Sequence, residues 1–254
     1  MSRAGGLARI RLHGNPGTHE GRRLGGIHSL KTHQARKTGF KLLHRVTFPS
    51  PSVKLAELLG ILAGDGHIGE YQTTMTTNSV TDIQHARYTQ KLLEDLFRLP
   101  VSLTFRKGKK ACVVVISSKE VGRFLVAKGM QKGHKIRGGL CIPKWILSRI
   151  KYRAAFIRGL FDTDGCVYID RHRIKGKEYR NIGMAFTNRS LPLLADFKES
   201  LESYGLHPTQ KTKYTVFLRR KEDIRRYFDV IGSSNPKHTE KLLKYFSSKK
   251  GGVA

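Results

Sequence analysis

The feature of this sequence that most constrains its fold is a pair of nine-residue segments that are versions of each other. The first is Leu58–Gly66 and the second is Ile157–Gly165, and an offset of 99 positions places one on the other. Four identical pairs result: Ala56 with Ala155, Gly60 with Gly159, Asp65 with Asp164, and Gly66 with Gly165. A repeat at a fixed offset predicts two halves of similar structure, related by a pseudo-twofold axis.

Each segment is predicted to lie in a helix that ends at its last glycine. Ser50 and Ser52 are candidate N-caps of the first helix, and Gly66 and Gly165 are expected to end the two helices in a left-handed conformation. Small residues at every fourth position favour close packing of the two helices. These residues are Ala56, Gly60 and Gly64, and Ala155, Gly159 and Thr163. The predicted core anchors are Leu55, Leu58, Leu62, Phe156, Leu160 and Phe161.

Packing of the two helices would bring Asp65 and Asp164 together at one end. A carboxylate at a helix C-terminus opposes the helix macrodipole. Two carboxylates about 5 Å apart repel by roughly 3 kcal/mol at an effective dielectric constant of about 20. Divalent cations reverse the sign of this interaction, and Mg²⁺ is commonly held by a few carboxylates with water and substrate phosphates. A lone Asp-Gly pair is usually only a turn, but two pairs in matched helical contexts favour a metal site.

The charge of the chain points to a nucleic-acid partner. Its 254 residues include 48 Lys and Arg against 19 Asp and Glu, a net charge of +29. This excess is larger than solubility requires, and it favours a polyanion. A ribosomal or histone-like protein is the simpler alternative, but such a chain would not need twin acidic motifs. A basic membrane-surface protein is disfavoured because no basic helix with a broad apolar face is evident.

The cysteines and the hydropathy indicate where such a chain resides. Cys112, Cys141 and Cys166 are widely spaced, form no CxxC pair and lie among apolar residues. We therefore expect buried free thiols in a reducing compartment. No run of 18 apolar residues and no signal-peptide pattern is present. These features predict a soluble protein in the cytoplasm or another intracellular compartment.

The sequence divides into four segments. Residues 1–48 form a basic, glycine-rich arm with ten Lys or Arg and one acid. Two readings are open: an extended arm that tracks phosphates, or a solvated or partly disordered tail. Residues 49–150 and 151–248 form the two repeats, and 249–254 form a short tail. Each repeat is predicted to run helix–strand–strand–helix–strand–strand–helix. Expected helices after the motifs are 81–97, 118–128, 190–204 and 222–231; expected strands are 71–77, 101–107, 111–117, 166–170, 181–187, 209–213 and 215–219.

The open face of each sheet is predicted to contact the partner. Along 101–107, Val101, Leu103 and Phe105 alternate with Ser102, Thr104 and Arg106, which places the polar set on one side of the sheet. A two-stranded ribbon with basic residues fits the DNA major groove, although an ordinary solvated sheet face is the alternative. The candidate DNA-binding residues are Arg106, Lys109, Lys110, Arg171, Arg173, Lys175, Lys211 and Lys213. The segment 171–177 is expected to be a basic hairpin tip.

The two segments resemble the LAGLIDADG motif of homing endonucleases, in the single-chain form with two motifs. The resemblance covers about residues 52–247 and leaves the N-terminal arm outside it. The first copy departs at Ala63, where the second has Asp162; this earlier acidic position is not the metal-binding one in the family. The resemblance implies an α+β fold in which two αββαββα repeats form a saddle of antiparallel sheets, with the motif helices at the interface.

The resemblance also implies a DNA endonuclease that cleaves both strands across the minor groove and leaves 3′ overhangs. Asp65 and Asp164 would be catalytic and would ligate Mg²⁺, with Mn²⁺ as a substitute, together with the main-chain carbonyls of Gly64 and Thr163. A lysine near each scissile phosphate is expected. The matching residues are Lys135 and Lys237, with Lys132 as a rival in the first half and a plain surface lysine as the alternative reading. Thr77-Asn78 and Thr187-Asn188 are expected to cap the following helices rather than to line the site.

The expected partner is double-stranded DNA with a long target site, bound by a monomer because both halves lie in one chain. The second hypothesis is a maturase that binds intron RNA on the same fold. The third is a DNA-binding regulator with a decayed site. Intact aspartates in both motifs favour cleavage over these two. A self-splicing intein is disfavoured because no Cys or Ser opens the chain and it ends in Gly251-Gly252-Val253-Ala254.

Overall fold

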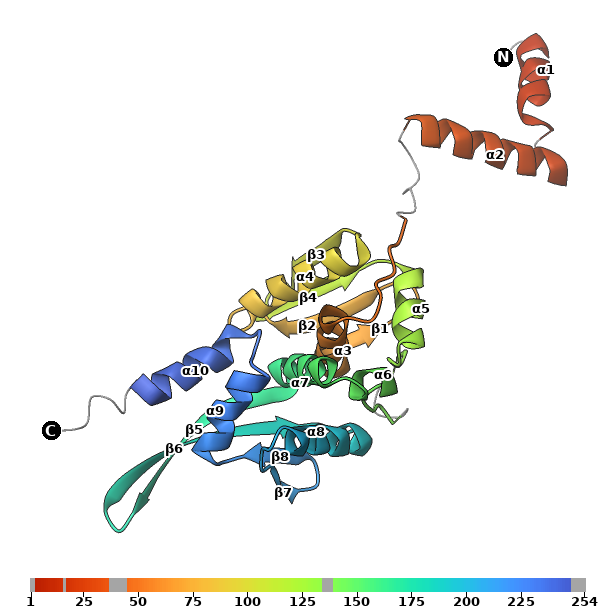
Figure 1. Ribbon diagram of the computed structural model, residues 1–254. Helices are drawn as coiled ribbons and strands as arrows, with labels where there is room; N and C mark the ends of the chain where they lie inside the picture. The colour runs from red at the N-terminus through yellow and green to blue at the C-terminus, as the bar shows by residue number, and fades with distance from the viewer. Residues whose placement is uncertain (1–2, 16, 37–44, 134–138, 248–254) are drawn as a thin grey trace. The chain divides into compact units, whose positions relative to one another are not determined.

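The computed structural model describes residues 3–15, 17–36, 45–133 and 139–247 (Figure 1). The chain divides into two compact units, Met1–Arg45 and Val46–Ala254, which are called the N-terminal unit and the body below. Within the described ranges, no helix combines the length and the apolar character that a membrane crossing requires.

The described part of the N-terminal unit is helical. Helix α1 spans Arg3–His13 and α2 spans His19–Arg36. The backbone N–H and the hydroxyl of Thr18 donate to the Asn15 carbonyl at 3.0 and 2.9 Å, and the Gly21 N–H donates to the Thr18 hydroxyl at 3.0 Å. The expectation of an extended arm is therefore wrong for these residues, because local polar contacts initiate a helix that hydrophobic periodicity does not reveal.

The body consists of two repeats with the same order of elements. The first contains α3 (Val53–Asp65), β1 (Gly66–Ile68), β2 (Thr73–Asn78), α4 (Ile83–Phe97), β3 (Val101–Phe105), β4 (Ala111–Ile116) and α5 (Lys119–Ala127). The second contains α7 (Ile150–Asp164), β5 (Gly165–Ile174), β6 (Lys177–Thr187), α8 (Leu191–Ser203), β7 (Thr209–Thr212), β8 (Thr215–Leu218) and α9 (Lys221–Val230). The short helix α6 (Lys144–Leu147) precedes α7, and α10 (Pro236–Ser247) follows α9. The predicted αββαββα order is confirmed.

Each repeat contains one four-stranded antiparallel sheet. The two strand orders are equivalent, β1-β2-β4-β3 and β5-β6-β8-β7. Along β4, the buried Cys112, Val114 and Ile116 alternate with half-buried residues, so one face of the sheet packs on helices and the other is open. The predicted alternation along 101–107 fails at Phe105, which is 61% exposed. The reason is that β3 ends at this residue, beyond the cover of the helices.

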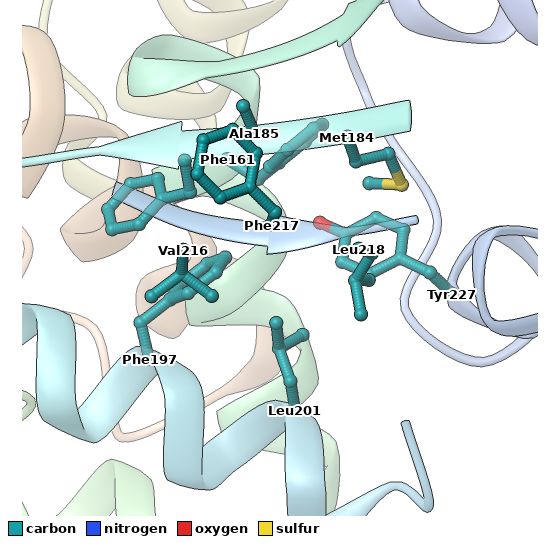
Figure 2. Close-up of a pocket in the computed structure, with 10 residues that line it drawn as sticks. Phe161, Met184, Ala185, Phe197, Leu201, Val216, Phe217, Leu218 and Tyr227 are labelled. Carbon is teal, nitrogen blue, oxygen red and sulfur yellow. The ribbon is translucent and has the colours of Figure 1, made fainter. Parts of the chain in front are cut away.

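The motif helices are anchored in the core, as the apolar pattern predicted: all six anchors are at most 3% exposed. In the second repeat, Phe161 from α7 lies among aromatic side chains of the sheet and the helices (Figure 2). Its ring centroid is 5.2 Å from that of Tyr227, and the rings of Phe186 and Phe197 stack at 4.0 Å. The space left among these side chains is about 10 Å³, which is too small for a ligand, so this region is a packed core.

Two other expectations are corrected by the structure. Cys112 is buried as predicted, but Cys141 and Cys166 are exposed; Cys166 lies on the open face because it alternates with the buried Val167 along β5. The segment expected to be a hairpin tip is mostly strand, since β5 continues to Ile174. Only Lys175 and Gly176 form the turn, with φ values of 49° and 79°, the two positive angles that a type I′ hairpin turn requires.

Candidate active site

Helices α3 and α7 form the most extensive contact between any two described elements (Figure 1). A Cβ added to Gly60 would lie 2.1 Å from the Phe156 carbonyl oxygen, and one added to Gly159 would lie 2.3 Å from the Glu57 carbonyl oxygen. No side chain fits at these separations, so the two backbones approach as closely as glycine allows. The predicted packing of the motif helices through their small residues is confirmed.

The C-terminal turns of the two helices also touch. A Cβ added to Gly64 would lie 2.0 Å from the Thr163 hydroxyl oxygen and 3.4 Å from Cγ of Asp164. Because Asp65 directly follows Gly64, the two acidic ends belong to one small region, and both aspartates are half-buried there. The glycines that follow are not left-handed as expected: φ is −81° at Gly66 and −94° at Gly165. They are needed for space, because a Cβ would meet the preceding helical turn at less than the closest normal approach.

A pocket of about 260 Å³ opens beside these helix ends. It is lined by Ala63, Gly64, Leu140, Asp164, Thr187, Asn188, Arg189 and Ser190. Asn188 donates from its side-chain nitrogen to Oδ2 of Asp164 at 2.8 Å, and its Oδ1 accepts from the backbone N–H of Ser190 at 2.8 Å. The sequence predicted that Asn188 caps α8, but the N-cap of α8 is Ser190 and no side chain caps it. Asn188 instead orders the turn before α8 and orients the Asp164 carboxylate.

The counterpart in the first repeat, Asn78, forms a turn before α4 and not the predicted helix cap, since the N-cap of α4 is Asp82 and no side chain caps it. Oδ1 of Asn78 accepts from the backbone N–H groups of Val80 and Thr81 at 2.8 and 3.1 Å. Ser52 does cap α3 as predicted, because its hydroxyl accepts from the Leu55 N–H at 3.2 Å.

The donors at the helix ends fit one class of metal site. No group of three or more His, Cys, Asp or Glu side chains converges on a possible cation site within the described residues. A closed structural cage is therefore excluded for those residues. Two carboxylates beside an open pocket instead fit Mg²⁺ or a similar hard cation, whose remaining ligands are carbonyl oxygens, water and substrate phosphates.

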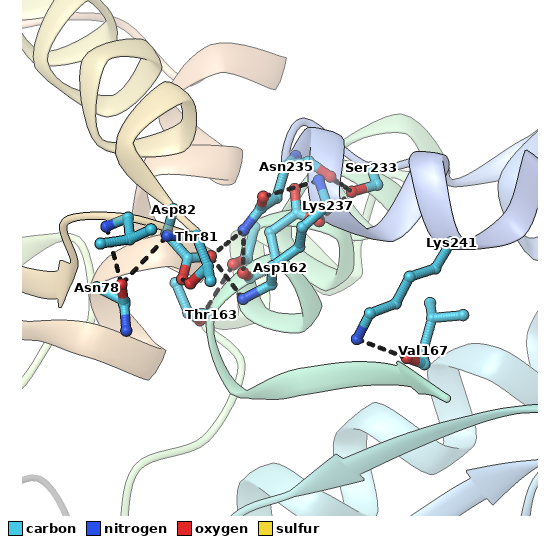
Figure 3. A network of polar contacts seen from close by, with 12 residues as sticks. Asn78, Thr81, Asp82, Asp162, Thr163, Val167, Ser233, Asn235, Lys237 and Lys241 are labelled. Carbon is cyan, nitrogen blue, oxygen red and sulfur yellow. Dashed lines mark hydrogen bonds and ion pairs between the residues drawn. The ribbon is translucent and has the colours of Figure 1, made fainter. Parts of the chain in front are cut away.

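Lys237 is held by the opposite repeat (Figure 3). Its Nζ lies 2.5 Å from Oδ1 of Asp82, which precedes α4 and is buried. Asn235 donates from Nδ2 to the same Asp82 oxygen at 2.7 Å and to the main-chain carbonyl of Asp162 at 3.1 Å. The Thr81 hydroxyl donates to the second Asp82 oxygen at 2.7 Å. Burial is the largest single influence and opposes ionisation of Asp82, but the hydrogen bonds from Lys237, Asn235 and Thr81 together outweigh it and lower the carboxyl pKa.

A second set of polar contacts joins α7 to the segment that precedes α10. The Ser233 hydroxyl and the Ser234 N–H donate to the two carboxylate oxygens of Asp162 at 2.5 and 2.7 Å. Glu57 on α3 accepts two bonds from the Arg158 guanidinium, at 3.1 and 2.6 Å, and a third from the Ser234 hydroxyl at 2.5 Å. The carboxylate of Asp162 is therefore a structural anchor, with a pKa that burial raises to about 7.

The remaining predicted site residues fall in three places. Lys135 lies outside the described residues. Lys132, its rival, is paired with Glu70, which also contacts Lys119 at 2.8 Å. The eight candidate DNA-binding residues are all exposed, in the β3–β4 turn, in or beside the β5–β6 hairpin, and in or beside β7. The sequence did not predict the roles of Asp82, Ser233 or Glu57. A signal was available only for Glu57, a charged residue on a motif helix that is otherwise apolar.

Comparisons with known proteins agree with this geometry. The family model described as a LAGLIDADG-like domain matches residues 151–232. Among solved structures, the I-LtrWI LAGLIDADG homing endonuclease bound to target DNA is similar with a TM-score of 0.55 and 10% identity, over 79% of this chain and 92% of that one. I-DmoI in complex with DNA and Ca is similar with a TM-score of 0.52 and 18% identity, over 76% and 97%. At these identities the structures show the fold alone.

Curated relatives match over a limited part of their own length. The tRNA-splicing ligase RtcB of Methanopyrus kandleri is 25% identical over 202 residues, which is 70% of this chain and 20% of that protein. The ribonucleoside-diphosphate reductase NrdEB subunit alpha of Bacillus subtilis is 29% identical over 229 residues, 75% of this chain and 21% of that protein. Because the match covers only about a fifth of each of these proteins, the activities in their names do not follow from it.

Proposed function

We propose that this chain, which carries a LAGLIDADG-like domain and has the fold of the LAGLIDADG homing endonucleases, is a site-specific endonuclease that cleaves both strands of a DNA duplex. The observation that carries the proposal is the contact between the C-terminal turns of α3 and α7, each of which ends in an aspartate. Packing two like-charged groups together is unfavourable by itself. Cations and a phosphate at this point would make it favourable.

The charge distribution supports a nucleic-acid substrate. Every predicted DNA-binding side chain is exposed, and the net charge of the chain is +29. A duplex lying on the open sheet faces would meet the β3–β4 and β5–β6 hairpins and the turn at Lys213. The solved structures of similar fold include complexes with DNA, which favours DNA over intron RNA. One chain supplies both halves, so we propose action as a monomer across the minor groove.

The chemistry follows from the residues at the helix ends. Asp65 and Asp164, with the carbonyl oxygens of Gly64 and Thr163, would hold Mg²⁺ or Mn²⁺ in the presence of substrate phosphate. Bound divalent cations would supply a hydroxide nucleophile and stabilise the leaving 3′ oxygen. Asn188 keeps the Asp164 carboxylate in one orientation through its 2.8 Å bond. Lys237 supplies a positive charge near the phosphate, and the companion role of Lys135 stays a prediction.

Cleavage of a randomised duplex library tests the proposal. The full chain is incubated with the library in Mg²⁺ and, separately, in Ca²⁺, and the cut and the retained sequences are read. We expect double-strand cuts with 3′ overhangs at one long site in Mg²⁺ and retention of the same site in Ca²⁺. Retention without cutting under both ions would instead indicate a DNA-binding regulator. Retention of structured RNA in place of duplex would support the maturase alternative.

A further inference from the structure

The N-terminal unit carries a polar stripe with two arginines along one helix face. Residues 3–36 contain seven Lys or Arg and a single acid, Glu20, whose carboxylate lies 2.6 Å from Arg23. Arg22, Ser29 and Arg36 are spaced seven residues apart on α2, and all three are exposed. Side chains seven apart share one face of a helix, so this stripe runs for about 21 Å at 1.5 Å per residue. A stripe of this length is comparable with several phosphate spacings of a duplex.

The described residues of the same unit form no core. Its apolar side chains are exposed: Leu7 is 55%, Ile10 43%, Leu12 65%, Leu24 40%, Ile27 38% and Leu30 45% exposed. The one buried residue among those described is Gly21. Three glycines in α2 each cost about 1 kcal/mol of helix stability relative to alanine, and isolated helices of this length are marginal in water. The unit therefore needs a partner to be stable.

Charge complementarity identifies the chemistry of that partner as a polyanion. A membrane surface is the less suitable polyanion because residues 1–36 contain no Trp, Tyr or Phe, the residues that anchor amphipathic helices at the lipid interface. A duplex bound by the body is close at hand, since the covalent connection raises the effective concentration of the unit beside it.

We propose that the N-terminal unit is a second DNA-binding module, which contacts the phosphates of the duplex beside the target site through the Arg22, Ser29 and Arg36 face. The inference rests on the proposed function in one respect, that the body binds a DNA duplex. Residues 37–45, at the end of the unit, separate α2 from the body, and nine residues span at most about 30 Å. The Arg36 contact therefore lies within roughly nine base-pair steps of the point where the body ends on the duplex, and the Arg22 contact, about 21 Å farther along α2, lies within roughly fifteen.

The test measures how binding depends on the length of flanking DNA. Duplexes with the recovered target site and flanks of increasing length are titrated with the full chain in Ca²⁺, as wild type, as the Arg22→Gln/Arg36→Gln variant, and as a matched control. The control, Arg87→Gln/Lys91→Gln, also removes two exposed charges from one helix, α4. Glutamine has a helix propensity close to that of Arg and Lys, and circular dichroism verifies equal helix content.

We expect affinity of the wild type and the control to rise about tenfold as the flank grows to about fifteen base pairs, and then to level off. The Arg22→Gln/Arg36→Gln variant should lose that gain and show a salt dependence that is lower by about two units in slope, because two phosphate contacts are removed. Binding to the minimal site should be the same for wild type and this variant.

Three results would overturn the inference: no gain with flank length in the wild type, a gain that the variant retains, or binding of the unit to anionic vesicles in place of the flank. The same experiment distinguishes failure of the proposed function from failure of this inference. A chain that gains affinity from flanks but never cuts refutes the endonuclease assignment alone. A chain that cuts but gains nothing from flanks refutes the module alone.

Discussion

The two repeats of the body have the same topology but are held by different chemistry. At the position where α7 has Asp162, α3 has Ala63. The Asp162 carboxylate accepts bonds from Ser233 and Ser234 and so fixes the segment before α10; an alanine offers no such acceptor. The charged pair between Glu57 and Arg158 has no counterpart by the repeat either, since the matching residues are Phe156 and Leu59.

This difference shows which part of the duplicated fold is under common constraint. Glycines at the helix crossing and aspartates at the helix ends occur in both copies: two packed helices need matching small residues, and the cation site that we propose needs matching acids. The surrounding polar contacts need not match, because each only has to satisfy its own buried groups. The departure at Ala63 is therefore a change in packing support and leaves both terminal aspartates in place.

The largest expected effect concerns the terminal aspartates, which both repeats share. Asp65→Asn and Asp164→Asn should each lower double-strand cleavage in Mg²⁺ by at least about a thousand-fold, because a lost cation ligand removes charge stabilisation worth several kcal/mol. Duplex binding should survive, since the basic faces are unchanged. Conversion of supercoiled plasmid with one target site to the linear form measures cleavage, and retention in Ca²⁺ measures binding.

Asp162→Asn serves as the matched control for this prediction. It removes a carboxylate two residues from Asp164 on the same helix, but its partners are Ser233 and Ser234, so it should cost stability with cleavage largely retained at low temperature. Undiminished cutting by either terminal variant, or complete loss in the control at a temperature where it is folded, would contradict the assignment of roles.

The helix crossing could be predicted from the sequence, and the polar contacts could not. Glycine spacing, apolar anchors and strand periodicity are local signals, and they gave the helices, the strand order and the contact of the motif ends. The bond from Asn235 to Asp82 joins residues 153 positions apart, and no local pattern indicates it. The same holds for Cys166, whose exposure depends on which face of β5 the helices cover.

Substitution of a glycine at the helix crossing has the next largest expected effect. Gly60→Ala should lower the free energy of unfolding by about 3 kcal/mol, since its Cβ would meet the Phe156 backbone, which cannot move aside as a side chain can. Gly122→Ala on α5 is the control: its Cβ would make contacts of 3.5 and 3.7 Å, so helix propensity should make it stabilising by up to about 1 kcal/mol. Urea unfolding of both variants measures the difference. Equal effects would mean that close approach is not what requires Gly60.

Buried histidines provide a smaller, pH-dependent effect. His238 is 1% exposed, its ring nitrogens have no hydrogen-bond partner within the described residues, and burial lowers its pKa to about 3 from 6.5. The unfolded chain binds a proton below pH 6.5 while the folded protein does not, so stability is lost as pH falls. His238→Phe should remove about 2 kcal/mol of the loss between pH 8 and pH 5. Thermal unfolding of the wild type and the variant across this range measures it.

The smallest expected effect is a difference in cleavage rate between the two strands of the substrate. Asp82→Asn removes the charge that holds Lys237 at 2.5 Å, and the lysine, which is 27% exposed, can then turn toward solvent. If Lys237 acts at one scissile phosphate, cleavage of that strand alone should slow by about tenfold, or roughly 1.4 kcal/mol, and nicked circles should accumulate. In a Lys237→Met background the same substitution should add nothing, because the group it positions is gone. Equal slowing of both strands, or additive losses in the double variant, would show instead that Asp82 supports only the junction of the two repeats.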